Sequence, residues 1–300
     1  MNTRLLSAAV LAAALVAPAT AAAPAGAAAA LKPLTGAAVY LSYGKGYPIS
    51  RYEPGKGFTK LGAMPMTGQF SASPDGRRIA WITGGGAVQV SDGRTVSTAA
   101  KGAGAGAPCL TPVWSPDSRQ VAFLAQGQGD AQRVVVVNAD GTRRRTAGST
   151  RGVCHLAWSA NGRYLAGYAG TTEGVYRFDL STGRSVRAKG IGLANHVQSL
   201  SPDGMKVVVA PLSRNAPGGD GSWPGGFRPA IVDIVTGKKM PIPVKGSLIG
   251  AFYLRDGRLA VRVAGRAANT LVVLDANGRQ LQRLAEPAAA KRQALLQIVR

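Results

Sequence analysis

A pattern of apolar and polar positions occurs in five copies along this chain. The first copy reads QFSASPDGRRIAWITG over 69–84, where a short apolar run meets a Ser-Pro-Asp-Gly turn and a second apolar run follows. The later copies are TPVWSPDSRQVAFLA at 111–125, HLAWSANGRYLAGYA at 155–169, VQSLSPDGMKVVVA at 197–210 and a degenerate AFYLRDGRLAVRVA at 251–264. Measured at the proline position, the spacings are 42, 44, 42 and 53 residues. A period near forty with strand patterns on both sides of each turn predicts a β-propeller.

The turn at the centre of each copy has a structural explanation. Asp-Gly and Asn-Gly accept the positive φ that a tight hairpin between twisted strands requires, and the preceding proline ends the first strand. These pairs are Asp75-Gly76, Asn161-Gly162, Asp203-Gly204 and Asp256-Gly257, whereas Asp117-Ser118 departs from the rule. We therefore interpret these aspartates as turn residues rather than catalytic carboxylates.

A second set of turns gives the number of blades. It comprises Pro54-Gly55, Asp92-Gly93, Asp140-Gly141, Thr182-Gly183, Thr236-Gly237 and Asn277-Gly278. Each blade should contain one turn of the first set and one of the second set. The chain has five turns of the first set and six of the second, which predicts an all-β, six-bladed propeller of four-stranded blades. In this arrangement, 39–62 supplies three strands of the last blade. The apolar run Leu295–Val299 is expected to supply the missing inner strand, so that N- and C-terminal strands close one blade and leave no open sheet edge. A helix beginning within Ala288–Lys291 is the competing prediction.

The repeat resembles that of TolB-type propellers, also called the WD40-like PD40 repeat. The matching segments are Ser73–Trp81, Ser115–Phe123, Ser159–Gly167, Ser201–Val209 and, weakly, Leu254–Val261. The resemblance implies an exported six-bladed propeller used for binding proteins or ligands. Propellers host unrelated activities, so the fold alone does not decide the function. We expect no α/β domain of the kind that TolB carries before the repeats, and TolB's own partners are therefore not carried over.

The amino terminus has the pattern of an export signal. A basic start is followed by the apolar Leu5–Ala17 and by Ala19-Thr20-Ala21, which fits a cleavage site. We expect a signal peptide over 1–21, a flexible Ala/Pro leader over 22–34 and the propeller over 35–300, with no transmembrane segment in the mature chain. No cysteine lies near the cleavage region, which argues against a lipid anchor.

The net charge and the positions of the basic residues indicate the kind of binding partner. The formal net charge is +22, and many basic residues lie on or just after the turns, among them Arg143, Arg144, Arg145 and Arg258. Because both kinds of turn fall on one face of a propeller, that face is expected to attract anionic polymers such as wall polymers or anionic lipid surfaces. Export and the lack of a base-reading motif argue against specific nucleic-acid binding. The alternative is that the charge serves only solubility.

The longest insertion, 211–229, is expected on the opposite face. It carries Trp223 and Phe227 beside Arg214 and Arg228, which suggests a recognition loop, although the loop could also fold Trp223 against the disc. Asp220 on this loop, with Asp130 and Glu173, could form a cation or ligand site. The alternative is that these acids are simply solvated.

The two cysteines and two histidines complete the candidate chemistry. Cys109 and Cys154 are expected to open the inner strands of neighbouring blades, and an even pair in an exported chain predicts a disulfide. His155 and His196 are expected near the channel, but two histidines fall short of a metal set. We expect no catalytic residues, no metal and no cofactor.

These observations favour a secreted, monomeric, non-catalytic binding or scaffold module at the cell envelope. Its partner would be an envelope protein or an anionic polymer. The alternative is a propeller enzyme, such as a hydrolase or lactonase, that acts on a small or sugar-like ligand at the long-loop face.

Overall fold

The computed structural model describes residues 31–44, 46–63, 68–127, 129–216 and 221–299. The chain divides into Met1–Lys32 and Pro33–Arg300, and the description below concerns the second part. The signal peptide over 1–21 and most of the leader over 22–34 lie outside the described residues, so both stay predictions. Leu34, the last residue of that leader, is buried, and its N–H donates to Gln282 Oε1 (2.8 Å).

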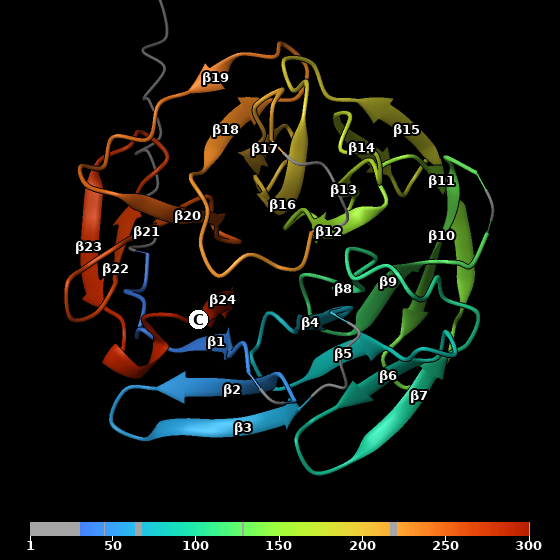
Figure 1. Ribbon diagram of the computed structural model, residues 1–300, viewed down its shortest axis with the longest axis horizontal. Coiled ribbons are helices and arrows are strands. Elements are labelled where there is room, and N and C mark those ends of the chain that lie inside the picture. The colour runs from blue at the N-terminus through green and yellow to red at the C-terminus, as the bar shows by residue number, and fades with distance from the viewer. Residues whose placement is uncertain (1–30, 45, 64–67, 128, 217–220, 300) are drawn as a thin grey trace, which may run out of the picture. The chain divides into compact units, whose positions relative to one another are not determined.

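The second part forms six sheets of four antiparallel strands, arranged as blades around a common centre (Figure 1). Blade 1 comprises β4 (Phe70–Ala72), β5 (Ile79–Ile82), β6 (Val88–Ser91) and β7 (Val96–Ala100). Blade 2 comprises β8 (Val113–Trp114), β9 (Gln120–Leu124), β10 (Gln132–Asn138) and β11 (Arg145–Thr150). Blade 3 comprises β12 (Cys154–Trp158), β13 (Tyr164–Tyr168), β14 (Val175–Asp179) and β15 (Arg184–Arg187).

The remaining blades follow in chain order until the last, which is shared between the two ends. Blade 4 comprises β16 (Ala194–Leu200), β17 (Lys206–Pro211), β18 (Ala230–Asp233) and β19 (Lys239–Met240). Blade 5 comprises β20 (Leu248–Tyr253), β21 (Leu259–Val263), β22 (Thr270–Leu274) and β23 (Gln280–Ala285). Blade 6 comprises β24 (Ala294–Ile298), β1 (Ala38–Leu41), β2 (Pro48–Glu53) and β3 (Gly57–Ala63). The prediction of an all-β, six-bladed propeller is confirmed.

Closure of the ring by both termini is also confirmed. β24 pairs antiparallel with β1, from Ala38 opposite Ile298 to Leu41 opposite Ala294, and it is the innermost strand of blade 6. The competing helix is reduced to one 3₁₀ turn over Ala288–Ala290 that precedes the strand. Within the described residues this turn is the only helix, and no helix there is long and apolar enough to cross a membrane.

The repeated turns owe their shape to a serine and an acid or amide two residues later. Ser73 Oγ donates to Asp75 Oδ1 (2.5 Å) and accepts the Arg78 N–H (2.9 Å), and the same arrangement recurs in blades 2, 3 and 4. In blade 2, where glycine is missing, Ser118 itself adopts the left-handed conformation (φ 62°). These carboxylates are therefore occupied in shaping turns, as the sequence predicts.

Candidate functional site

The long loop between β17 and β18 folds back into the ring. Trp223 is 8% exposed, and its ring lies 5.2 Å from that of His155 and 4.7 Å from that of His196. The ring of Phe227 also packs on His196, with ring centroids 4.9 Å apart. Of the two interpretations of this loop, the structure therefore shows the one in which Trp223 folds against the disc.

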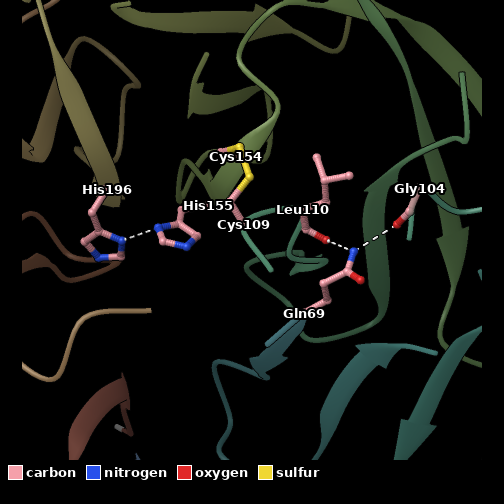
Figure 2. Close-up of a disulfide and its surroundings, with 7 residues drawn as sticks. All are labelled: Gln69, Gly104, Cys109, Leu110, Cys154, His155 and His196. Carbon is pink, nitrogen blue, oxygen red and sulfur yellow. Dashed lines mark hydrogen bonds between the residues drawn. A yellow bond between two sulfur atoms is a disulfide. The ribbon is translucent and has the colours of Figure 1, made fainter. Parts of the chain in front are cut away.

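The two histidines lie inside the ring on neighbouring inner strands, β12 and β16, and the pairing of both strands is irregular at the histidines. The register of β12 shifts between Cys154 and Ala157, where His155 takes a positive φ of 46°, and the register of β16 shifts between Ala194 and His196. β-bulges of this kind commonly redirect a side chain. The two histidines, 41 positions apart in sequence, thereby meet, with 2.7 Å between their Nδ1 atoms (Figure 2).

The hydrogen bonds assign the protons of this histidine pair. His196 Nε2 lies 2.9 Å from Gln198 Oε1. Since an amide oxygen only accepts, His196 carries its proton on Nε2, and His155 Nδ1 donates to His196 Nδ1. Burial lowers the pKa of His196 to about 4, while burial and the neighbouring His196 hold the pKa of His155 well below its usual range. Both rings are therefore neutral at pH 7. In the described part of the chain, no three His, Cys, Asp or Glu side chains gather closely enough to hold a metal ion.

We expect the stability of the protein to fall as the pH drops from 6.5 to 4. The unfolded state binds protons on both histidines near pH 6.5, whereas the folded state resists protonation until lower pH, so acid favours unfolding. For His196 alone, a pKa of about 4 in place of 6.5 corresponds to roughly 3 kcal/mol. Urea titrations at a series of pH values measure this slope.

A variant isolates the contribution of the histidines to that slope. His196→Gln removes one of the two buried titrating groups and should make the loss of stability between pH 6.5 and 4 clearly shallower than in the parent. A variant with an unchanged slope would show that other groups cause the acid sensitivity.

A disulfide next to His155 joins blades 2 and 3, as predicted (Figure 2). Cys109 and Cys154 are bonded, with their Cα atoms 4.7 Å apart. Cys154 begins β12, but Cys109 lies in a turn before β8 rather than opening that strand, because β8 begins only at Val113. On the same inner side of the ring, Gln69 Nε2 donates to the carbonyls of Leu110 (3.0 Å) and Gly104 (2.9 Å), which ties blade 1 to the same segment.

Replacing both cysteines by serine should lower the free energy of unfolding by about 2–4 kcal/mol, because the bond closes a long loop of the unfolded chain. Denaturant titration of the parent and of Cys109→Ser/Cys154→Ser measures the difference. Thiol titration of unreduced, unfolded parent should find no free thiol. Two free thiols would rule out the bond.

The predicted basic residues lie on the turn face, with exceptions. Arg143 and Arg144, which lie between β10 and β11, and Arg145, which begins β11, are all exposed. Arg143 lines a pocket of about 530 Å³ together with Arg78 and Arg119, and with the turn carboxylates Asp117 and Asp140. Hydrogen bonds from Thr142 hold the pKa of Asp140 below its usual range, so the pocket is lined by charges of both signs.

Arg258 does not belong to the exposed basic face and corrects the expectation drawn from its position after a turn. Its side chain is 2% exposed, and it pairs with Asp256 at 2.8 Å. Arg163 remains at the surface but is paired with Asp179 at 2.7 Å. The arginines of the 143–145 segment have no ion pair with any residue that the structure describes.

Those of the polar residues predicted around the long loop that the structure describes do not gather into one site. Arg228 is exposed near Phe227, whereas Arg214 and Glu173 line a separate groove between blades 3 and 4. Asp220 lies outside the described residues. Asp130 is exposed and does not line that groove.

Sequence reasoning missed a buried ion pair at the seam where the ring closes. Arg262 Nε donates to Glu286 Oε2 (2.8 Å), and the guanidinium also donates to the carbonyls of Gly225 (3.0 Å), Gln293 (2.9 Å) and Ala290 (3.2 Å). Tyr40 Oη donates to the other carboxylate oxygen (3.0 Å). Burial and the charge of Glu286 raise the pKa of Tyr40, which keeps this donor protonated. The available signal was one arginine inside the otherwise apolar run LAVRV (259–263).

The fold defines the chain as a six-bladed β-propeller with a buried histidine pair inside the ring and exposed arginines at 143–145. In structure it is similar to TolB from Acinetobacter baumannii, with 18% identity over 88% of this chain and 67% of that chain and a TM-score of 0.56. The resemblance to TolB propellers is thus confirmed at the level of the fold.

Proteins of quite different names share this architecture. A chain of a nidogen/laminin complex matches 87% of this chain and 99% of its own length, with 12% identity and a TM-score of 0.52. Hydrazine synthase from Kuenenia stuttgartiensis matches 86% of this chain and 89% of its own, with 14% identity and a TM-score of 0.53. No protein-family model matches the sequence, and no curated protein matches it. At these identities the likeness concerns the fold alone.

Proposed function

We propose that this chain is an exported, non-catalytic binding or scaffold propeller of the cell envelope, which binds anionic polymers or an anionic partner protein through its turn face. The observation that carries the proposal is the run Arg143, Arg144 and Arg145, which is exposed and forms no ion pair among the described residues, although the Arg144 guanidinium lies over the Phe123 ring. Three adjacent guanidinium groups can each donate to phosphate or carboxylate oxygens.

The charge of the whole chain supports the same function. A net charge of +22 attracts polyanions over distances of about one Debye length, roughly 10 Å at 0.1 M salt. The disulfide is consistent with an oxidising compartment outside the cytoplasm. A monomer with no specific nucleic-acid partner is part of this proposal.

The polar side chains that could act in catalysis already interact with other groups of the protein, which supports a non-catalytic role. The turn carboxylates are hydrogen-bonded to their own turns, Glu286 is paired with Arg262, and the histidine pair is covered by Trp223. An enzyme needs acids, bases or nucleophiles that converge on an accessible cavity. The enzyme interpretation therefore has less support than binding.

Replacing Arg143, Arg144 and Arg145 by serine should weaken binding to phosphatidylglycerol vesicles roughly a hundredfold at low salt, at about 1 kcal/mol for each basic residue near an anionic surface. Co-sedimentation with vesicles measures this change, and phosphatidylcholine vesicles serve as the uncharged control. The melting temperature should stay that of the parent, because the three side chains are exposed. If the variant binds the vesicles as well as the parent does, the positive charge serves solubility and not binding.

A further inference from the structure

Blade 4 differs from the other blades in its outer strand. β19 has two residues, whereas the outer strands of the other five blades have four to seven (Figure 1). Pro241 and Pro243 follow it, and proline has no N–H with which to continue a ladder. Pairing between β18 and β19 therefore involves only Ile231 and Val232, and Ala230 has no partner in β19.

A groove lies beside this shortened strand, and Lys239 of β19 contributes to its lining. Its volume is about 630 Å³, and it lies between blades 3 and 4. Its lining includes apolar side chains from the connection between the two blades and from blade 4, namely Ile191, Leu193, Val209, Leu212 and Val232. The space is far larger than one ion needs, and adjacent strands lie only about 4.8 Å apart, so an extended peptide is a suitable occupant.

The rim of this groove carries three exposed cationic side chains, Arg187, Arg214 and Lys239, and one carboxylate, Glu173. None of the three cations forms an ion pair with a residue that the structure describes. Gly174 leaves room for the Arg187 side chain, because a Cβ atom at position 174 would lie only 2.7 Å from Arg187 Nε. The groove thus combines an apolar lining with an unbalanced positive rim.

We propose that this groove binds an extended segment of a partner protein in which acidic and apolar residues alternate. In an extended chain, side chains alternate between two sides, so the apolar ones can contact the partly buried Leu193 and Leu212 while the carboxylates reach the arginines and Lys239. This site is distinct from the turn face and requires apolar contacts that a polyanion does not provide.

The test uses a fluorescein-labelled octapeptide of alternating aspartate and valine, with binding to the full chain followed by fluorescence anisotropy. Arg187→Glu/Arg214→Glu should weaken binding at least tenfold. The matched control, Arg279→Glu/Arg283→Glu, makes the same change in charge at exposed positions of blade 5 and should stay within about twofold of the parent. An octapeptide of alternating aspartate and serine should bind the parent at least about tenfold more weakly.

A further variant separates this groove from the turn face. Arg143→Ser/Arg144→Ser/Arg145→Ser should bind the aspartate–valine peptide like the parent, even though its binding to anionic vesicles is weakened. The proposal is overturned if the two glutamate pairs weaken binding equally, if the serine peptide binds as tightly as the valine peptide, or if the parent does not bind the valine peptide.

Discussion

Deleting Ala294–Arg300 is expected to abolish the cooperative unfolding transition of this protein. The deletion removes β24, the inner strand of blade 6, and with it the buried side chains of Leu295, Leu296, Ile298 and Val299. At about 1.5–3 kcal/mol for each buried aliphatic side chain, the loss is comparable with the whole stability of a typical domain, about 5–15 kcal/mol. It also exposes an edge of β1 in the middle of the ring. Circular dichroism during heating measures the outcome.

A substitution in the same strand provides the control for this deletion. Gln297 is only partly buried, and Gln297→Ala should melt within a few degrees of the parent because surface substitutions usually change stability by about 0.5 kcal/mol or less. A truncated chain that melts like the parent would show that the ring closes without β24.

Glu286→Ala is expected to lower the free energy of unfolding by about 3–5 kcal/mol, or the melting temperature by roughly 10 °C. The substitution leaves the Arg262 guanidinium buried without its counter-ion, and arginine cannot lose its proton to adapt. It also removes the acceptor of the Tyr40 hydroxyl. Because Arg262 additionally binds the carbonyls of Gly225 and Gln293, the damage should spread to the long loop and to the connection before β24.

The surface pair of Arg163 and Asp179 is the comparison for this buried pair. Its geometry is equally close, at 2.7 Å, but the arginine side chain is half exposed. Arg163→Ala should therefore cost less than about 1 kcal/mol. Equal effects of Arg163→Ala and Glu286→Ala in differential scanning calorimetry would contradict the structural role of the seam.

The fold was predictable because its determinants are local and repeated. Ser73, Asp75 and Gly76 form a turn from residues within one short segment, and the same chemistry recurs at regular spacing. The inner strand at 294–298 followed from counting turns, since one blade lacked a strand and one apolar run remained unassigned. Even the irregular Asp117-Ser118 turn keeps its shape, because Ser118 accepts a positive φ.

The candidate sites were less predictable because they depend on contacts across blades. The sequence placed His155 and His196 near the channel, but the register shifts that accompany their meeting have no signature in a single strand. Trp223 could have faced solvent, and only its packing on both histidines shows that it lies inside. Arg258 follows a turn, as the exposed arginines do, yet its side chain is almost completely buried and forms an ion pair with Asp256. The groove between blades 3 and 4 depends on where Pro241 and Pro243 end a strand, which a repeat pattern does not reveal.

The most direct test of the central claim is the salt dependence of vesicle binding by the parent and by Arg143→Ser/Arg144→Ser/Arg145→Ser. If the turn face binds polyanions, the affinity of the parent for phosphatidylglycerol vesicles should fall steeply from low salt to about 0.5 M salt, because screening shortens the reach of the exposed charges. The fall should be shallower for the triple variant, which has lost three of those charges. An affinity of the parent that does not change with salt, or curves for the two proteins that coincide, would contradict the claim.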